Sequence, residues 1–310
     1  MHAALDALLG GTKRLALDYS PDCEIPNIAF ADAGTVEFLR ARGYEVVSSA
    51  DLFQIGAMVW DEAALASHAR ASAAVAAVKD AAFGFVAEAL RAGRRVTEHE
   101  VQSFIADALA HRGLEYEGVP VVQVNQHAGA IYYEPPAEGS AVISPGDWLL
   151  IDLWAREPGE ENVYADIAWV AYAGRDVPTQ MQRVFDIVRA ARDAVIKALA
   201  EAWRLGDTLR GWQLDRVARD LITKHGYGDY FGHRTGHSMG PGKRLHGLGV
   251  NLDDFETHDT RRVLPGLGFS VEPGIYLPDF GVRLEVNVHF APDTGPRVTT
   301  PLQTDIVRLL

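Results

Sequence analysis

The stretch "GFSVEPGIYL", residues 268–277, contains a carboxylate in an otherwise apolar run. Phe269, Val271 and Ile275 give it the composition of a buried strand, and Glu272 stands among them. Burying an unpaired carboxylate costs several kcal/mol, so such a residue is paired, protonated or bound to a metal. What surrounds Glu272 therefore decides how the fold and the function are interpreted.

A second stretch repeats this pattern earlier in the chain. "SPGDWLLID" (144–152) ends in Asp152 and "LPGLGFSVE" (264–272) ends in Glu272, and in both a Pro-Gly pair begins seven residues before the acid. Each acid is followed by a second one, Asp166 after 14 residues and Glu285 after 13. These intervals suit two strands joined by a loop or hairpin.

The segments before the acids correspond as well. Residues 93–113 and 206–226 have the same length from glycine to glycine and share the positions of their apolar residues, and each follows a long helical segment. In the first, Thr97 and Glu100 form a capping-box pattern that predicts a helix start. Each half is thus predicted as helix, helix and a β-ribbon with two inward carboxylates. We expect an α+β fold with pseudo-twofold duplicated halves.

In such a duplicate the four acids converge on one place. Two unit charges about 4 Å apart repel by about 4 kcal/mol at an effective dielectric near 20, so four carboxylates cannot share a pocket unaided. Two divalent cations would cancel the four charges, as in two-metal hydrolytic sites. The alternative is pairing of some acids with arginine, for which Arg283, two residues from Glu285, is a candidate.

A glycine-rich segment supplies histidines. In "YFGHRTGHSMGPGKRLHGLG" (230–249), glycines before and after His237 allow a close backbone approach and make its imidazole a candidate ligand. His233, His237 and His246 could instead form a mononuclear zinc site. Oxygen donors with one imidazole favour manganese or iron, with cobalt or zinc also possible.

The composition limits the protein class. The 310 residues carry a formal net charge of −13, which disfavours nucleic acid or an anionic membrane as the main partner. The single cysteine, Cys23, rules out an intramolecular disulfide and fits a reducing cytoplasm. The start of the chain shows no secretory signal, and no apolar stretch approaches the length of a membrane span.

Residues 1–57 read as strand, helix and strand, a thin basis for an independent domain, and residues 58 to about 90 read as an alanine-rich helix.

The motifs "HRTGHSMG", "SVEPGIYLPDFGVRLEVN", "LLIDLWA" and "VYADIAWV" closely resemble the pita-bread metallopeptidases. That family includes methionine aminopeptidase, Xaa-Pro aminopeptidase and prolidase, with creatinase as a metal-free relative. The resemblance covers residues 58–310 as a catalytic domain, and residues 1–57 look like the tail of a creatinase-like amino-terminal domain. It implies a pita-bread fold and two divalent metal ions, manganese first, held by five residues: Asp152, Asp166, His237, Glu272 and Glu285.

The resemblance also implies roles around the metals. Glu272 would serve as general base towards a water that bridges the metals. His246 would donate a hydrogen bond to the substrate or the intermediate, and His233 would line the prolyl side. Tyr132 and Arg283 are expected on the substrate side. A short peptide substrate and a homodimer are the partners that the resemblance implies.

Three departures from the family pattern bear on activity. Tyr132 stands where the relatives have a histidine, and tyrosine, with a pKa near 10, is a poor proton shuttle at neutral pH. The nearby His127 could compensate. The interval from His237 to His246 is two residues longer than usual, and Ala168 replaces a threonine that commonly supports Asp166.

We therefore expect a dinuclear metal-dependent exopeptidase that hydrolyses Xaa-Pro bonds, similar to Xaa-Pro aminopeptidase or prolidase. One alternative is a catalytically impaired protein of this fold that acts as a binding module. A second is a hydrolase of this fold that acts on a substrate other than a peptide.

Overall fold

The structure is a computed structural model that describes residues 7–310. The helices are α2 (Ala33–Ala41), α3 (Ala50–Ala57), α4 (Glu62–Arg91), α5 (Glu98–Ala110), α6 (Thr179–Leu205) and α7 (Gly211–Lys224). The strands are β1 (Arg14–Leu17), β2 (Glu45–Ser48), β3 (Val121–Val124), β4 (Trp148–Ala155), β5 (Ala165–Tyr172), β6 (Ser238–Met239), β7 (Gly268–Val271), β8 (Gly274–Tyr276), β9 (Gly281–Arg283), β10 (Val286–Ala291), β11 (Gly295–Val298) and β12 (Val307–Arg308).

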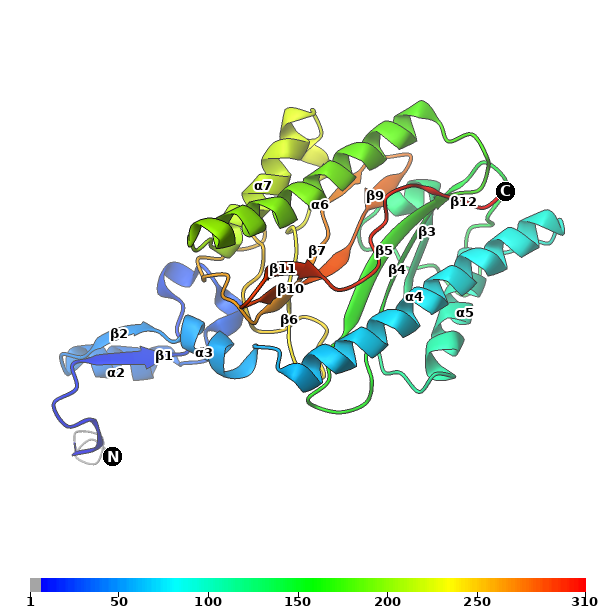
Figure 1. Cartoon of the computed structure of the whole chain (residues 1–310). Helices are drawn as coiled ribbons and strands as arrows, with labels where there is room; N and C mark the ends of the chain where they lie inside the picture. Colours follow the sequence, from blue (N-terminus) through cyan, green and yellow to red (C-terminus); the bar gives the residue numbers. More distant parts are fainter. Residues whose placement is uncertain (1–6) are drawn as a thin grey trace.

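The two halves repeat the same order of elements, as predicted. In the first half, α4 and α5 precede the strands of a four-stranded sheet ordered β12-β5-β4-β3. In the second half, α6 and α7 precede a sheet ordered β11-β10-β7-β6. Figure 1 shows the two long helices α4 and α6 on either side of the strands. Each helix pair buries its apolar face against its own sheet, which gives two hydrophobic cores.

Local sequence signals set the helix starts. The predicted capping box of α5 is present, since the Glu100 N–H donates to Thr97 Oγ1 at 3.2 Å and the Thr97 N–H to Glu100 Oε2 at 2.7 Å. The long helix expected from residue 58 begins only at Glu62, with Asp61 as its cap, because the preceding residues bridge to the second half. Val59 pairs with Leu267 there.

The strand register brings the acids of each half to one face. Asp152 lies opposite Ala168, so Asp166, two residues earlier on β5, points to the same side of the sheet. In the second half Val271 lies opposite Val286, and continuing that register by one residue sets Glu272 opposite Glu285. The insertion between these strands forms the hairpin β8–β9. The period of two in a strand thus explains why both members of each pair face inwards.

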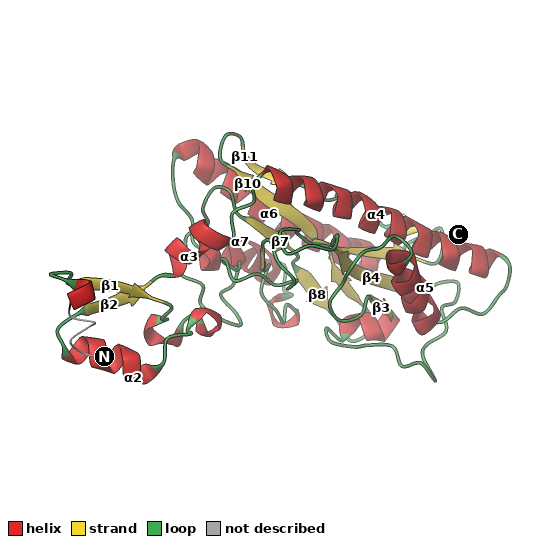
Figure 2. Cartoon of the chain, turned by 90° about the horizontal axis from the view of Figure 1, so that it is seen from below, coloured by secondary structure: helices red, strands yellow, loops and turns green. Residues whose placement is uncertain are grey.

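Strands β1 and β2 and helix α2 lie at one end of the molecule, opposite the carboxyl terminus (Figures 1 and 2). Strands β1 and β2 pair in parallel, with α2 between them in the chain. The second strand expected from the sequence "YEVVSSADL" (44–52) is wrong beyond Ser48, because residues 50–57 form α3. The side chain of Gln54 on α3 donates to the carbonyl of Arg262 at 2.8 Å and so attaches α3 to the second half.

The first six residues of the predicted amino-terminal segment lie outside the described residues, and the boundary at residue 57 stays a prediction. Between residues 7 and 310, no helix has the length and apolar character needed to cross a membrane.

Candidate metal centre

The segment that carries His233 and His237 is anchored by a buried ion pair on α7. Arg219 donates to both carboxylate oxygens of Asp215, at 2.7 and 3.0 Å, and to the carbonyls of Phe231 and His233. Asp215 also accepts from the N–H and the hydroxyl of Thr235. The spacing of four residues on one helix face makes this pair. It fixes the backbone on both sides of His233.

The glycine before His237 is required by close packing, as the sequence indicates. A Cβ on Gly236 would lie 2.0 Å from the carbonyl oxygen of Ser270 on β7. The N–H of His237 donates to Ser270 Oγ at 2.8 Å, and that hydroxyl in turn donates to Glu272 Oε1 at 2.9 Å. Ser270, which the sequence analysis did not identify, therefore positions a histidine and a carboxylate together.

The imidazole of His237 points an unprotonated nitrogen at three carboxylates. Its Nδ1 donates to the carbonyl of Ser238 at 3.1 Å, so Nε2 carries the lone pair. This Nε2 lies 3.3 Å from Asp166 Oδ2, 3.6 Å from Glu272 Oε1 and 4.0 Å from Glu285 Oε1. Burial, followed by the charge of Arg234, lowers the pKa of His237 to about 3, so a proton on Nε2 does not relieve the contact.

The fourth acid, Asp152, pairs with an arginine instead of facing His237. Arg283 Nη2 lies 2.7 Å from Asp152 Oδ2, so the arginine alternative holds for one of the four carboxylates. One guanidinium against four carboxylates leaves an excess of three negative charges when all are ionised. Pairing with arginine therefore does not replace a metal at this site.

Burial raises the pKa of each of the four acids. The pKa rises to about 7 for Asp152 and Asp166 and to about 8 for Glu272, in each case with burial as the largest cause and the Arg283 charge opposing it. The pKa of Glu285 rises well above its usual value through burial and the charges of the neighbouring acids. Without a cation, the cluster holds protons near neutral pH.

The unsatisfied atoms show that the residues fit a cation. Oδ1 of Asp152, Oδ1 of Asp166 and Oε1 of Glu285 are buried and have no hydrogen-bond partner among the described residues. Asp166, His237 and Glu285 each offer one ligand atom within 4.8 Å of the others. Orphaned carboxylate oxygens beside an imidazole lone pair are donors for a divalent metal ion.

A cavity of about 820 Å³ opens onto this cluster. All four acids and His237 line it, so the structure brings the five predicted metal ligands together in one place. The side chain of Glu272 is 13% exposed, against 4% for Asp166 and 2% for Glu285. Glu272 is thus more accessible to a molecule in the cavity than either of these acids.

The other two histidines of the segment, His233 and His246, differ in the partners of their ring nitrogens. His233 Nδ1 donates to the Arg234 carbonyl and its Nε2 accepts from the Tyr276 hydroxyl, both at 2.7 Å. With both nitrogens occupied, His233 cannot join a three-histidine zinc site, and it presents only its ring to the cavity. The ring of His246 lies 4.1 Å from that of His237 and contacts Arg234.

Tyr132 lies at the mouth of the cavity, where its side chain is 84% exposed. His127, the residue expected to compensate for the missing histidine, has its Nδ1 2.9 Å from Glu98 Oε1 and its ring stacked on Tyr133. It is not among the residues that line the cavity. Glu98 is fully buried and also accepts from the Tyr133 hydroxyl at 2.9 Å, so this cluster supports the cavity wall.

Ala168 lacks the hydroxyl that the relatives commonly have, yet the neighbouring Asp166 is supported from another strand. The N–H of Asp166 donates to Asn287 Oδ1 at 2.8 Å. Asn287 lies on β10, two residues after Glu285, and is fully buried. The spacing of the acids does not predict this residue. Its only signal in the sequence is an amide between two valines, Val286 and Val288.

Comparisons with known proteins show the family of this chain. Residues 67–291 match the model of Metallopeptidase family M24. The fold and the site define the class as pita-bread proteins with a candidate metal centre. The chain belongs to Metallopeptidase family M24.

Individual relatives point the same way. The chain is 34% identical over 210 residues to the Xaa-Pro dipeptidase of Lactobacillus helveticus, which covers 66% of this chain and 51% of that protein. The chain thus spans about half the length of this relative.

Solved structures confirm the pita-bread fold. Dipeptidase PepE from Mycobacterium ulcerans has a TM-score of 0.69 at 23% identity, with 99% of this chain and 74% of that chain covered. The X-prolyl aminopeptidase from Caenorhabditis elegans, a cytosolic enzyme with a di-nuclear active site, has a TM-score of 0.64 at 20% identity, with 86% and 43% covered. At these identities the likeness shows the fold alone.

Proposed function

We propose that this protein is a dinuclear metal-dependent exopeptidase that hydrolyses Xaa-Pro bonds, as an Xaa-Pro aminopeptidase or a prolidase-like dipeptidase. The observation that carries the proposal is the unprotonated Nε2 of His237, which faces three carboxylates within 4.0 Å. The Xaa-Pro dipeptidase relative supports the substrate class.

The proposed ligands are the five donors around the cavity: Asp152, Asp166, His237, Glu272 and Glu285. Four carboxylates and one imidazole suit two divalent ions, and we propose manganese ahead of cobalt, zinc or iron. When bound, such ions polarise a peptide carbonyl and acidify water. Arg283 pairs with Asp152 beside these donors.

Glu272 is proposed as the proton acceptor. A general base has to reach both the cavity and the reacting water. Glu272 is more exposed to the cavity than Asp166 or Glu285, and the Ser270 hydroxyl fixes one of its oxygens at 2.9 Å. That hydrogen bond orients the carboxylate through Oε1, and its other oxygen, Oε2, is proposed to take the proton.

The substrate is proposed to lie among four side chains of the cavity. His246 donates a hydrogen bond to the substrate carbonyl or to the oxyanion that forms from it. The ring of His233, held edge-on against Tyr276, forms a flat wall that suits a proline ring. Tyr132 contacts the substrate at the mouth. Arg283 contributes from beneath through its pair with Asp152.

One observation favours a second candidate, a binding protein with impaired turnover. A phenol such as that of Tyr132 is a weak general acid for the leaving amine, and His127 is engaged by Glu98. This candidate predicts metal and peptide binding without cleavage. A hydrolase of another substrate class would instead cleave only substrates that are not peptides.

The test combines metal analysis with a substrate panel. The purified protein is freed of metal, reloaded with manganese, cobalt or zinc, and assayed on Xaa-Pro dipeptides and an Xaa-Pro-Xaa tripeptide. Metal-dependent cleavage at the Xaa-Pro bond supports the proposal, and preference for the dipeptide or the tripeptide separates dipeptidase from aminopeptidase. Two bound metals without cleavage of any peptide would reject the peptidase and favour the binding role. A protein that binds no divalent metal would reject both.

The oligomeric state and the partners of this protein are also proposals. We propose a homodimer that acts on short peptides in the cytoplasm, without nucleic-acid or membrane partners. Light scattering after size exclusion would give about twice the monomer mass of 33.8 kDa. A monomer over the working concentration range would reject the dimer.

A further inference from the structure

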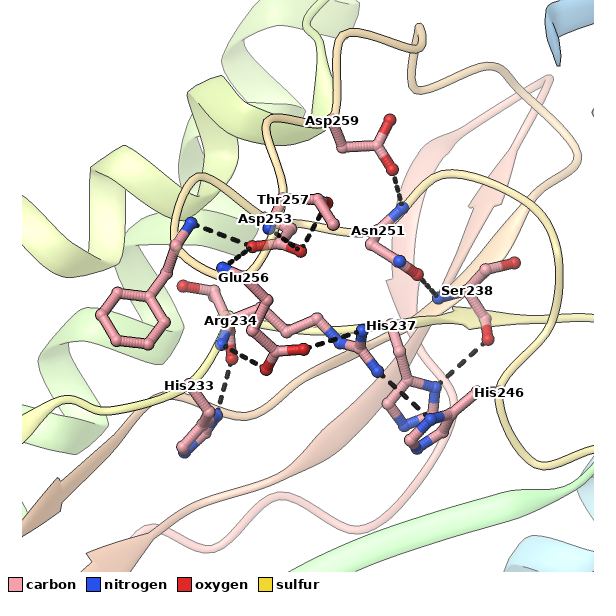
Figure 3. A network of polar contacts seen from close by, with 12 residues as sticks. His233, Arg234, His237, Ser238, His246, Asn251, Asp253, Glu256, Thr257 and Asp259 are labelled. Carbon is pink, nitrogen blue, oxygen red and sulfur yellow. Dashed lines mark hydrogen bonds and ion pairs between the residues drawn. The ribbon is translucent and has the colours of Figure 1, made fainter. Parts of the chain in front are cut away.

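The guanidinium of Arg234 holds a defined position between a carboxylate and an imidazole. Its Nη1 lies 3.2 Å from Glu256 Oε2, and its Nη2 lies 3.2 Å from Nδ1 of His246 (Figure 3). The backbone N–H of Arg234 also donates to Glu256 Oε1 at 3.3 Å. One carboxylate therefore holds both the main chain and the side chain of this arginine.

Glu256 is itself held in place by a buried turn. The carboxylate of Asp253, which is fully buried, accepts from the N–H groups of Phe255, Glu256 and Thr257 at 2.9 to 3.0 Å. It also accepts from the Thr257 hydroxyl at 2.7 Å. Four hydrogen bonds to one carboxylate make the turn rigid, so the backbone that carries Glu256 has a fixed position beside Arg234.

The contact with Arg234 determines which nitrogen of His246 carries the proton. A guanidinium has five donors and no acceptor, so Nδ1 of His246 has to accept. A proton on that nitrogen would set two donors against each other at 3.2 Å. The ring proton therefore lies on Nε2, which makes no hydrogen bond to any protein group between residues 7 and 310.

We propose that Arg234 is a positioning residue that keeps His246 in the Nε2–H tautomer, so that its ring presents a hydrogen-bond donor to the substrate carbonyl. The use of this donor towards a substrate carbonyl rests on the proposed peptidase function. The tautomer of His246 does not depend on that function. Glu256 supports the same arrangement by fixing Arg234. Arg234 and Glu256 thus determine which nitrogen of the His246 ring carries the proton.

A competing role for Arg234 is direct binding of the substrate carboxylate. The pairing with Glu256 argues against it, because the charge of the guanidinium is already balanced. The two roles differ in their kinetic effect. A direct substrate contact raises KM when it is removed, whereas loss of a preoriented donor lowers kcat.

The experiment compares Arg234→Met, Arg234→Lys and Glu256→Ala in the zinc-loaded, ¹⁵N-histidine-labelled protein. The His246 signals are identified by their loss in His246→Asn. We expect wild type to show a protonated Nε2 and an unprotonated Nδ1, and Arg234→Met to show a mixture of tautomers. Arg234→Lys, which keeps a cationic donor, is expected to restore the wild-type pattern. Glu256→Ala leaves the guanidinium present but less fixed and is expected to give an intermediate pattern.

Kinetics on an Xaa-Pro dipeptide supply the second measurement. We expect kcat to fall about 10-fold or more in Arg234→Met with little change in KM, the size typical of losing a group that orients an active-site residue. Arg234→Lys should recover most of kcat. A wild-type His246 protonated on Nδ1, or an Arg234→Met spectrum identical to wild type, would overturn the proposal. A rise in KM at constant kcat would assign Arg234 to substrate binding instead.

The two proposals fail separately. The tautomer is read from the spectrum whether or not a peptide is cleaved. A tautomer shift in Arg234→Met together with no peptidase activity in wild type would remove the proposed function and leave the positioning role of Arg234 in place.

Discussion

Nε2 of His237 and Oδ2 of Asp166 lie 3.3 Å apart, and when Asp166 is ionised neither atom carries a proton to share. Two lone pairs at this distance repel each other, and burial prevents water from screening them. A divalent cation between them converts the repulsion into two bonds. The stability of this protein is therefore expected to depend on metal and, through the acids, on pH.

Metal removal should destabilise the protein more at high pH than at low pH. The pKa of Asp152 and of Asp166 is about 7 in the folded metal-free protein, against 3.8 for the free side chain. Between these values the folded state holds the extra protons, so the free energy of unfolding of the metal-free protein falls as pH rises from about 4 to about 7. Metal replaces these protons. At 100 times the Kd, metal should raise the melting temperature by about 5–10 °C.

The measurement is a thermal melt of metal-free and manganese-loaded protein at pH 6 and pH 8. The gap in melting temperature should be wider at pH 8. Asp166→Asn serves as the control, because it removes one titrating group and should narrow the difference between the two pH values. Equal melting temperatures with and without metal at pH 8 would contradict the shared site.

Substitution of the proposed base should remove turnover and leave the fold intact. In Glu272→Gln the side chain keeps its size and can still accept from Ser270 Oγ, but it cannot take up a proton. We expect kcat to fall by about 10²–10⁴-fold, the range for a lost general base. Steady-state kinetics with metal analysis of the same sample check this. A kcat within about 10-fold of wild type at full metal content would assign the base elsewhere.

The amide of Asn287 should matter for metal affinity. In Asn287→Leu the N–H of Asp166 loses its acceptor, so the strand that carries this ligand is less well held. We expect metal affinity to fall about 10–100-fold. Isothermal titration with manganese measures it. Gln303→Leu is the matched control, because Gln303 bonds the N–H and the carbonyl of Val170 on the same strand, away from the acids. It should lower stability without changing metal affinity, and equal losses of affinity in both variants would refute a specific role.

The buried ion pair between Asp215 and Arg219 should contribute strongly to stability. Asp215→Ala leaves a buried guanidinium uncompensated and removes the acceptor for Thr235, at an expected cost of about 3–5 kcal/mol. Urea denaturation measures the loss. Arg216→Ala on the same helix removes an exposed pair with Asp254 and should cost about 1 kcal/mol or less. Similar losses in the two variants would show that the buried pair does not anchor the loop.

The sequence predicted the parts of this site that depend on spacing along one element. A period of two in a strand places Asp152 and Asp166 on one face, and the repeat of that pattern around Glu272 and Glu285 predicts the duplicate fold. A capping box predicts the start of α5 for the same local reason.

Contacts between segments distant in sequence were not predictable in this way. Asn287 supports Asp166 from 121 residues away, and Glu256 fixes Arg234 across a loop whose turn depends on one buried aspartate. No periodic pattern marks such residues. The end of the second strand at Ser48 was also missed, because residues 50–57 are apolar enough to fit either a strand or a helix.

Replacing Tyr132 with histidine should raise peptidase turnover. Tyr132 is 84% exposed and lines the cavity, and a phenol is a weaker general acid towards a leaving amine than an imidazolium. An imidazole at this exposed position would titrate near its ordinary pKa of about 6.5, so it could exchange protons at the pH of the assay. We expect kcat of Tyr132→His to rise by about 10-fold, below the full range for general acid catalysis because an exposed side chain is poorly oriented. Tyr132→Phe is the control and should leave kcat near wild type if the hydroxyl takes no part. A loss of activity in Tyr132→Phe together with no gain in Tyr132→His would show instead that the tyrosine hydroxyl is itself used by this enzyme.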